Sequence, residues 1–249
     1  MIICKSPSEI EKLRTSGILV RRVLGEIRDQ VRPGVTTWDL EQFVVKRLKD
    51  AGAKPAFKGY RGYPCCLCAS LNSEVIHGIP SKRRTLAEGD ILSLDLGVVL
   101  NGYFGDSALT VPVGAINESA QRLLKVTEEA LELAITKVRL GNRLGDVSAT
   151  VQEHAEKNGY SVVREFVGHG IGRQLHEEPQ IPNFGQPGHG PALKPGMVLA
   201  IEPMVNTGRP EVRVLNDNWT AVTADGGLSA HFEHMVAVTR NGPDVLTRI

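Results

Sequence analysis

The spacing of apolar residues along the chain predicts several amphipathic helices. The segment Ser6-Pro7-Ser8-Glu9 is a capping box with proline at the first helical position, and it predicts a helix that continues to about Val31. Thr36 caps a second predicted helix, whose apolar residues share one face and which ends at Gly52. A matching pattern predicts a further helix that ends at Gly159, with Val147, Val151 and Ala155 on its apolar face.

The segments between and after these helices have residue patterns that are typical of β-strands. Each is rich in β-branched and other apolar residues and is bounded by turn-forming residues. Helices that are segregated from mostly antiparallel strands favour the α+β fold class. The predicted strands cover residues 65–70, 91–99, 103–111, 197–205, 211–215 and 231–238.

The chain is similar to itself when it is shifted by 107 positions. Residues Gly89–Asp95 then align with Gly196–Glu202, and several other segments align at the same shift with no net insertion. We therefore expect a single domain over residues 1–249 that is built from two similar halves, at roughly 6–110 and 113–240. A site on the pseudo-twofold axis between the halves would take equivalent residues from both.

Acidic residues interrupt two of the apolar strands. Leu92, Leu94 and Leu96 share one strand face, so Asp95 points to the other face. The repeat gives Glu202 an equivalent position in the second half. These two acids are therefore candidates for one shared site.

A hairpin brings a third acid to the face that carries Asp95. Asn101-Gly102 is a strong two-residue turn signal, and it sets Asp106 opposite Gly97. Asp106 is then a diagonal neighbour of Asp95, with roughly 7–8 Å between their backbones. Both carboxylates can reach one small ion.

Glu233 is a fourth acid in a predicted strand. We expect the neighbouring His231 and His234 to face away from it. A single strand acid more often faces solvent or pairs with an arginine. Four acids on one face repel one another and are costly to bury unpaired, and two divalent cations would balance their charge as in two-metal hydrolases.

Three histidines are candidates for the same site. His169 lies between Gly168 and Gly170, which let the backbone approach a crowded site closely. His176 lies seven residues further on, and His77 precedes a Gly-Ile-Pro segment. Taken singly, each is more typical of a surface or hydrogen-bonded histidine than of a metal ligand.

Composition narrows the classes of function. The chain is 41% hydrophobic and 23% charged, as ordinary globular proteins are. Its net charge of +1 gives no electrostatic basis for binding nucleic acid or an anionic membrane, and no run of 18 apolar residues is present to span a bilayer. Because the N-terminus has no apolar signal region, we expect a cytoplasmic protein with four reduced cysteines.

The order and content of these motifs resemble the type I methionine aminopeptidases. That family has the pita-bread fold, which it shares with prolidase, aminopeptidase P and creatinase. The resemblance covers nearly the whole chain and implies two pseudo-symmetric halves with antiparallel sheet and outer helices. The matching segments are Asn72–Pro80, Asp95–Gly97, Gly105-Asp106, Gly168–Gly172, His176–Pro179, Glu202-Pro203 and Glu233-His234.

This resemblance implies a dinuclear metal centre. Asp95 would bind one ion, His169 and Glu202 would bind the other, and Asp106 and Glu233 would bridge them. The expected cofactors are two divalent ions, Co²⁺, Mn²⁺ or Fe²⁺, with Zn²⁺ and Ni²⁺ as further candidates, because the ligand set is rich in oxygen.

The resemblance also implies catalytic and substrate-binding residues. Glu202 would carry the proton of the attacking water, His176 would steady the oxyanion, and His77 would contact the scissile amide nitrogen. Aromatic rings and a thiol would suit the flexible thioether of methionine, although core packing of the aromatic residues is an equal alternative without the resemblance. Phe57 and Leu175 differ from the residues that are common at these two positions in bacterial members of the family. The implied pocket is formed by Phe57, Tyr60, Tyr63, Cys68, Leu175 and Trp219.

The implied substrates are N-terminal methionyl peptides and nascent chains, and the ribosome is a candidate partner. We expect a monomer. Only 26 positions separate His176 from Glu202, which leaves no room for the helical insertion of type II members. Two alternatives remain open at this point: an exopeptidase of the same fold that cleaves beside proline, and a non-catalytic pita-bread module that binds protein partners.

Overall fold

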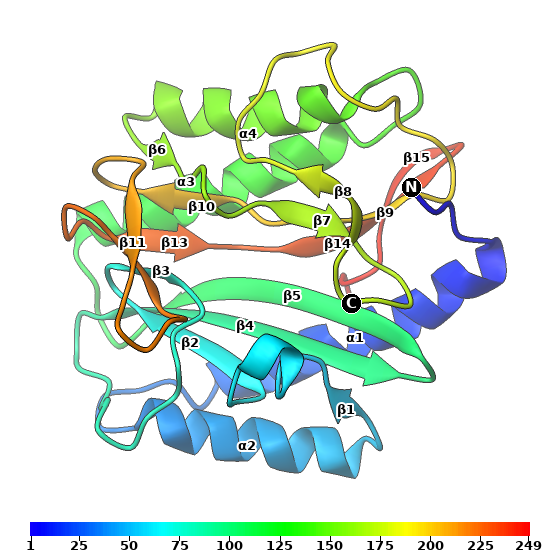
Figure 1. Cartoon of the computed structure of the whole chain (residues 1–249). Helices are drawn as coiled ribbons and strands as arrows, with labels where there is room; N and C mark the ends of the chain where they lie inside the picture. The colour runs from blue at the N-terminus through cyan, green and yellow to red at the C-terminus, as the bar shows by residue number, and fades with distance from the viewer.

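The computed structural model describes residues 1–249, and in the first half of the chain two helices precede a sheet (Figure 1). Ser6 caps the first helix through a reciprocal bond with Glu9, and Thr36 caps the second through the same arrangement with Asp39. The elements are α1 (Pro7–Arg28), α2 (Thr37–Asp50), β1 (Lys54–Pro55), a 3-10 turn (Tyr60–Gly62), β2 (Leu67–Leu71), β3 (Glu74–Ile76), β4 (Ile91–Leu100) and β5 (Tyr103–Pro112).

The first-half sheet is antiparallel and centres on one long hairpin. Strands β1 and β2 pair with successive stretches of one edge of β4, and β5 pairs along the whole of its other edge. Asn101 and Gly102 form the turn with positive φ angles, and the ladder sets Gly97 opposite Asp106. The hairpin and the register predicted from the sequence are therefore confirmed.

The second half begins with two more helices and continues into shorter strands. Its longest sheet has the order β15-β14-β9-β7-β8, and smaller sheets have the orders β13-β10-β6 and β11-β12-β3. The elements are α3 (Glu118–Thr136), α4 (Leu144–Lys157), β6 (Ser161–Val162), β7 (Gly168–Gly170), β8 (Glu177–Ile181), β9 (Val198–Ile201), β10 (Met204–Asn206), β11 (Val212–Val214), β12 (Ala221–Thr223), β13 (Ser229–His231), β14 (His234–Thr239) and β15 (Gly242–Val245).

The two halves are built alike in detail. Helix α4 begins at Leu144 and ends at Lys157, each 107 positions after the corresponding end of α2. The isolated bridges Thr36↔Thr85 and Arg143↔Ala192 are related by the same shift. The halves are therefore pseudo-symmetric, as the fold-class prediction required.

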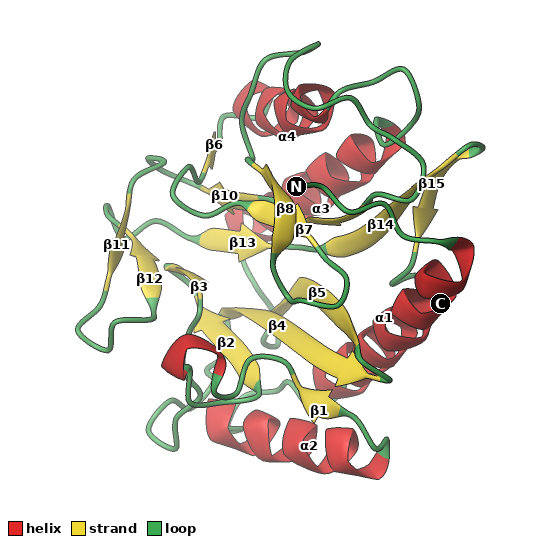
Figure 2. Ribbon diagram, turned by 45° about the vertical axis from the view of Figure 1, so that its right-hand side comes forward, coloured by secondary structure: helices red, strands yellow, loops and turns green.

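Helices cover the outer faces of the strands. In Figures 1 and 2 the β4–β5 hairpin lies between α1 and α2 on one side and the second-half strands on the other, while α3 and α4 cover the far side of those strands. One continuous apolar cluster of 41 buried residues runs through both halves. This arrangement confirms the α+β class and leaves the inner faces of the strands free to form a site.

Two of the predicted strands are interrupted. The run 197–205 is split into β9 and β10 at Glu202-Pro203, and the run 231–238 is split into β13 and β14 at Phe232-Glu233. Continuous strands were therefore the wrong expectation here; Pro203 has no N–H to donate to a ladder. The first helix also ends at Arg28 and not at Val31. No helix is both long enough and apolar enough to cross a membrane.

Candidate active site

Four carboxylates converge between the two halves. Asp95 lies on β4 and Asp106 on β5, while Glu202 and Glu233 lie at the two strand breaks. The flanking pairs Ile201↔His234 and Met204↔His231 set those two breaks opposite each other. The repeat and the hairpin thus bring acids from distant parts of the chain into one buried group.

Contacts between the halves hold this group together. The Glu233 backbone N–H donates to the carbonyl oxygen of Ala108, and the Ser107 hydroxyl donates to the carbonyl oxygen of Glu233 at 2.7 Å. The loop that carries Glu233 is therefore tied to the strand that carries Asp106, and the relative position of the two acids is set by backbone bonds.

All four carboxyl groups are removed from water. Burial raises the pKa of Asp95 to about 7 and that of Glu202 to about 8, and it raises the pKa values of Asp106 and Glu233 well above their usual range. One oxygen of each of Asp95, Asp106 and Glu233 has no hydrogen-bond partner although it is buried. Such orphaned acceptors are costly unless a cation binds them, so the donor set fits metal ions.

His169 presents a nitrogen lone pair to the acids. Its Nδ1 donates to the carbonyl oxygen of Gly170 at 2.9 Å, which leaves Nε2 unprotonated in the neutral ring. Nε2 lies 3.5 Å from Glu202 and 3.9 Å from Asp106, and burial lowers the pKa of the ring to about 3. Ligand atoms of Asp106, His169 and Glu233 lie within 4.8 Å of one another, close enough to hold one ion.

The glycines that flank His169 are required by close packing. A Cβ on Gly168 would lie 2.4 Å from the carbonyl oxygen of Ala200, and one on Gly170 would lie 2.2 Å from that of Glu178. The backbone of β7 can therefore approach β8 and β9 as the sequence suggested.

A cavity of about 250 Å³ opens onto the carboxylates, and every residue predicted for the site lines it. The same cavity is also lined by Arg61, Ile76 and Phe166, which sequence reasoning missed. Each of these three is close in the chain to a predicted site residue, and that adjacency was the only available signal. The predicted residues in its wall are Phe57, Tyr60, Tyr63, Cys68, His77, Asp95, Asp106, His169, Leu175, His176, Glu202, Trp219 and Glu233.

His77 is held in an uncommon backbone conformation at the rim of this cavity. Its φ is +61°, and a Cβ on the following Gly78 would lie 2.4 Å from the carbonyl oxygen of Ala69. The Gly78 N–H donates to the Ser70 hydroxyl, and the Gly78 carbonyl accepts from the Tyr63 hydroxyl at 3.1 Å. These bonds to strand β2 and to Tyr63 fix the direction of the imidazole.

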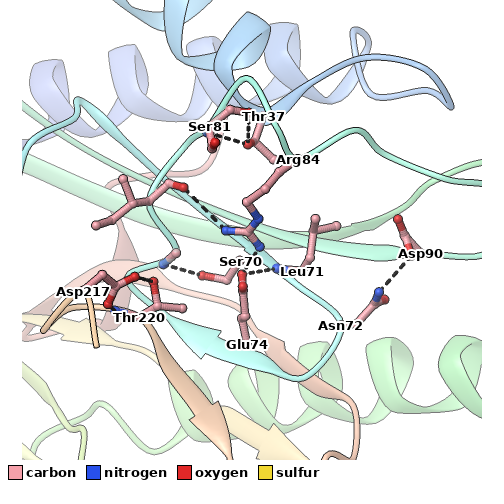
Figure 3. A network of polar contacts seen from close by, with 12 residues as sticks. Thr37, Ser70, Leu71, Asn72, Glu74, Ser81, Arg84, Asp90, Asp217 and Thr220 are labelled. Carbon is pink, nitrogen blue, oxygen red and sulfur yellow. Dashed lines mark hydrogen bonds and ion pairs between the residues drawn. The ribbon is translucent and has the colours of Figure 1, made fainter. Parts of the chain in front are cut away.

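Two separate sets of polar contacts brace the segment after His77 and the turn that carries Trp219; Figure 3 shows Arg84 with Glu74 in one set and Asp217 with Thr220 in the other. Arg84 pairs with Glu74 and donates to the carbonyl oxygen of Ile79 at 3.5 Å. Asp217 accepts from the backbone N–H groups of Trp219 and Thr220. Two walls of the cavity are thus braced from outside it.

His176 faces the metal-ligand candidates from the opposite rim. Its ring centroid lies 4.3 Å from that of His169, and its Nδ1 lies 2.7 Å from the Tyr60 hydroxyl. The loop before it is fixed by Glu177, which accepts from the Arg173 N–H at 2.9 Å and forms a buried ion pair with Lys5. The ring therefore borders both the acids and the cavity.

Aromatic rings and a thiol form the apolar end of the cavity. The rings of Tyr63 and Trp219 meet edge to face at 5.1 Å, and Cys68 packs in the same apolar cluster. Burial raises the pKa of the Cys68 thiol, so it is an apolar surface and not a thiolate. Leu175 is buried beside Phe57.

One prediction about this region is wrong. His231 was expected to face away from Glu233, but its Nε2 lies 3.6 Å from Glu202, inside the site. The physical reason is strand alternation, which places residues two positions apart on the same face. His234 does face away, since its Nδ1 lies 2.7 Å from the Thr247 hydroxyl.

Comparison with known proteins places this geometry in a family. The sequence pattern of metallopeptidase family M24 matches residues 11–240. The chain is 50% identical over 249 residues to methionine aminopeptidase 1 of Bacillus subtilis and 51% identical over 247 residues to methionine aminopeptidase of Clostridium acetobutylicum. These alignments cover 100% and 99%, respectively, of both chains.

Solved structures agree with the sequence comparison. The crystal structure of methionine aminopeptidase from Thermotoga maritima has a TM-score of 0.98 and 51% identity, with 100% of both chains covered. The prolidase of Pyrococcus horikoshii has a TM-score of 0.80 at 23% identity, with all of this chain but 64% of the prolidase covered, and it shares the fold alone. The fold is thus the pita-bread fold, and the chain belongs to metallopeptidase family M24.

Proposed function

We propose that this chain is a methionine aminopeptidase that hydrolyses the first peptide bond of proteins and prefers a small second residue. The observation that carries the proposal is the convergence of four buried carboxylates and His169 beside a cavity with one apolar end. Full-length similarity to proteins named methionine aminopeptidase supports the substrate assignment. The lower identity to prolidase, over part of that longer chain, favours this activity over cleavage beside proline.

The whole of residues 1–249 would act as one catalytic domain, with related halves at roughly 6–110 and 113–240. Asp95 and Asp106 come from the first half, whereas Glu202 and Glu233 come from the second. Because neither half holds the full set, a separated half would have no complete site.

Two divalent ions would be held by the five candidate ligands. Asp95 would bind one ion, His169 and Glu202 the other, and Asp106 and Glu233 would lie between them. Bound ions of this kind supply Lewis acidity and lower the pKa of water to near neutrality. The oxygen-rich set suits Co²⁺, Mn²⁺ or Fe²⁺, and it does not exclude Zn²⁺ or Ni²⁺.

Three side chains would handle protons and orient the substrate. Glu202 would accept the proton of the attacking water and deliver it to the departing amine. His176 borders the acids and would donate to the carbonyl oxygen as charge develops on it. His77 would contact the amide nitrogen of the bond that breaks, from a loop held by Ser70 and Tyr63.

The apolar end of the cavity would bind the first side chain. Tyr63, Cys68, Trp219 and Leu175 present rings, a thiol and an aliphatic group to it. An unbranched thioether is flexible and makes favourable contacts with aromatic rings, so methionine fits this wall. Phe57 and Tyr60 would complete the pocket.

The cellular setting follows from this activity. The substrates would be nascent chains with a free N-terminal methionine, so we propose a cytoplasmic enzyme that acts close to the ribosome. We also propose that it acts as a monomer, since one chain supplies every proposed ligand and pocket residue.

The direct test measures metal-dependent peptide cleavage. The protein would be stripped with chelator and reloaded with Co²⁺, Mn²⁺ or Fe²⁺, and then assayed on Met-Gly-Met and on X-Pro peptides. We expect release of methionine that requires the metal and weakens as the second residue becomes larger. Cleavage of X-Pro bonds alone would overturn the substrate assignment, and activity that survives complete metal removal would overturn the metal centre.

A further inference from the structure

Two buried histidines flank the carboxylate of Glu202 from different sides. His169 Nε2 lies 3.5 Å from Glu202 Oε1, and His231 Nε2 lies 3.6 Å from Glu202 Oε2. The His231 ring is 1% exposed, and neither of its nitrogens has a hydrogen-bond partner. A buried imidazole without a partner is costly, so its place beside a carboxylate calls for a physical explanation.

The two histidines differ in the bonding of the second ring nitrogen, Nδ1, and they therefore have different roles. His169 Nδ1 is fixed as a donor by the carbonyl oxygen of Gly170, so its Nε2 can offer a lone pair to a metal ion. His231 has no hydrogen-bond partner at Nδ1, and the only carboxylate within 4.0 Å of its ring nitrogens is that of Glu202. As a metal ligand Glu202 is a carboxylate, which only accepts, so the His231 nitrogen that faces it then carries the proton.

The backbone of His231 is fixed from the other half of the molecule. The Thr110 hydroxyl donates to the His231 carbonyl oxygen at 2.9 Å and accepts from the His231 N–H at 2.8 Å. Since the Thr110 proton is used there, the Ser93 hydroxyl, 2.8 Å away, donates to Thr110. Ser93 and Thr110 are cross-strand partners on β4 and β5, so the first-half hairpin sets the position of the ring.

We propose that His231 is a positioning residue: when Glu202 binds metal, the 3.6 Å contact between His231 Nε2 and Glu202 Oε2 closes to a hydrogen bond that His231 donates, and this turns Glu202 Oε1 toward the ion held by His169. This inference rests on the proposed metal centre and adds a residue to it. His231 does not bind the ion itself; it selects one orientation of a carboxylate that would otherwise rotate between ligands.

Two substitutions of His231 separate the effect of losing the hydrogen-bond donor from the effect of losing the imidazole ring. His231→Leu keeps an apolar side chain in the buried position but has no N–H, whereas the side-chain amide of His231→Gln can donate from nearly the position of Nε2. Partners that orient a metal ligand are typically worth about 10- to 100-fold in metal affinity or activity. We expect a loss in that range for His231→Leu and recovery of most of it in His231→Gln.

The matched control is His234→Leu. His234 is also a buried histidine, three positions further along, but its ring bonds to Thr247 away from the cavity. The His234→Leu variant shows how the loss of a buried histidine affects folding alone. We expect a lower melting temperature in this variant and an unchanged affinity for metal.

The experiment titrates each metal-free protein with Mn²⁺ or Co²⁺ in a calorimeter and records the visible absorption of the Co²⁺ form. Values of kcat and KM for Met-Gly-Met follow on the loaded proteins. We expect His231→Leu to bind the ion more weakly, to alter the Co²⁺ spectrum, and to lose kcat with little change in KM, while His231→Gln remains close to the parent.

The outcomes separate this inference from the proposed function. Equal metal affinity, spectrum and kcat in the parent and His231→Leu would overturn the role of His231 and leave the metal centre intact. A defect in His231→Gln as large as that in His231→Leu would also overturn it, because donation would not be what matters. Failure of the parent chain to bind either ion would overturn the metal centre and this inference together.

Discussion

The two halves of the molecule hold their acidic residues on strands of different construction. In the first half, β4 and β5 are unbroken ten-residue strands, and Asp95 and Asp106 lie inside a regular ladder. In the second half the equivalent strands are broken where Glu202 and Glu233 occur. A regular ladder fixes the direction of a side chain by alternation, whereas a break frees the chain to aim its acids from a different angle.

This difference shows how a duplicated fold can build an asymmetric site. Asp95 and Asp106 are diagonal neighbours, but the pairs around the second-half breaks set Glu202 and Glu233 opposite each other. The second half also supplies His169 from β7, and the first half has no imidazole among the five candidate ligands. The two halves thus offer unlike ligand sets, and substitutions in each test whether they act differently.

The largest effect is expected from replacing one acid of each half. Glu202→Gln removes a ligand and the proposed proton carrier together, so kcat/KM should fall by about 10³-fold or more. Asp95→Asn should lose one equivalent of bound metal with a smaller fall in activity. Metal analysis and steady-state assays on Met-Gly-Met measure both. Asp244→Asn, which alters a peripheral pair with Arg14, is the control and should match the parent. Full activity in Glu202→Gln would contradict the proposed mechanism.

The second prediction concerns the metal-free protein between about pH 7.5 and 8.5. In the folded chain the pKa of Asp95 is about 7 and that of Glu202 about 8, against ordinary values of 3.8 and 4.5. The folded state therefore binds more protons than the unfolded state in this window, and its stability falls as pH rises. Each group that titrates alone contributes up to about 1.4 kcal/mol per pH unit.

This window avoids interference from histidine. Burial lowers the pKa of His169 to about 3 and that of His77 to about 4, and it lowers the pKa values of His176, His231 and His234 as well. Since an unfolded histidine has a pKa of about 6.5, all of them are largely neutral in both states only above about pH 7.5. Thermal unfolding with and without Mn²⁺ measures the effect. We expect the decrease of the unfolding free energy with pH to be smaller in Asp95→Asn and in Glu202→Gln. We expect it to disappear when metal is bound. A stability that rises with pH in the metal-free parent would contradict this account.

The first half, in which β4 and β5 are unbroken, was also the half whose strand register could be predicted from the sequence. The turn at Asn101-Gly102 and strict alternation gave the register that sets Asp106 opposite Gly97, and the structure has that register. The capping boxes located α1 and α2 to within a few residues. Local rules suffice where one regular element holds the residue.

The strand breaks of the second half could not be predicted from the sequence in the same way. The breaks at Glu202-Pro203 and Phe232-Glu233 depend on packing between the halves, which a pattern of neighbouring residues does not encode. Phe166 reaches the cavity from a loop for the same reason. His231 was the exception, since its two-residue spacing from Glu233 did carry the signal. The individual roles of the site residues remain predictions that the experiments above address.

A third prediction compares one glycine from each half. A Cβ on Gly170 would lie 2.2 Å from the backbone carbonyl oxygen of Glu178, which only a shift of β8 can relieve. A Cβ on Gly97 would lie 2.5 Å from the Phe57 ring, which can rotate away, and 2.9 Å from the Ala56 Cβ, which needs to shift only slightly. Gly170→Ala should therefore destabilise the fold by about 1–3 kcal/mol, as overpacking usually does.

Gly97→Ala should act on the substrate and not on the fold. The displaced Phe57 ring borders the cavity, so KM for methionyl peptides should rise while the free energy of unfolding changes less than in Gly170→Ala. Denaturant unfolding and steady-state kinetics separate the two effects. If Gly97→Ala proved the more destabilising of the pair, the first-half strands would be packed more rigidly than the geometry indicates.

The smallest effect is expected at the second-half wall of the cavity. Leu175 is buried next to His176 and lines the cavity, and Leu175→Val removes one methylene group from that wall. A buried methylene is worth about 0.8 kcal/mol, so kcat/KM for Met-Gly-Met should fall by about fourfold. The loss should appear mainly in KM, because in the proposed pocket this side chain would contact the substrate's apolar end. Unchanged metal affinity measured alongside would verify that separation. A fall in kcat without a change in KM would instead indicate that Leu175 acts by orienting His176. Leu175 would then be a positioning residue for His176 and not part of the substrate pocket.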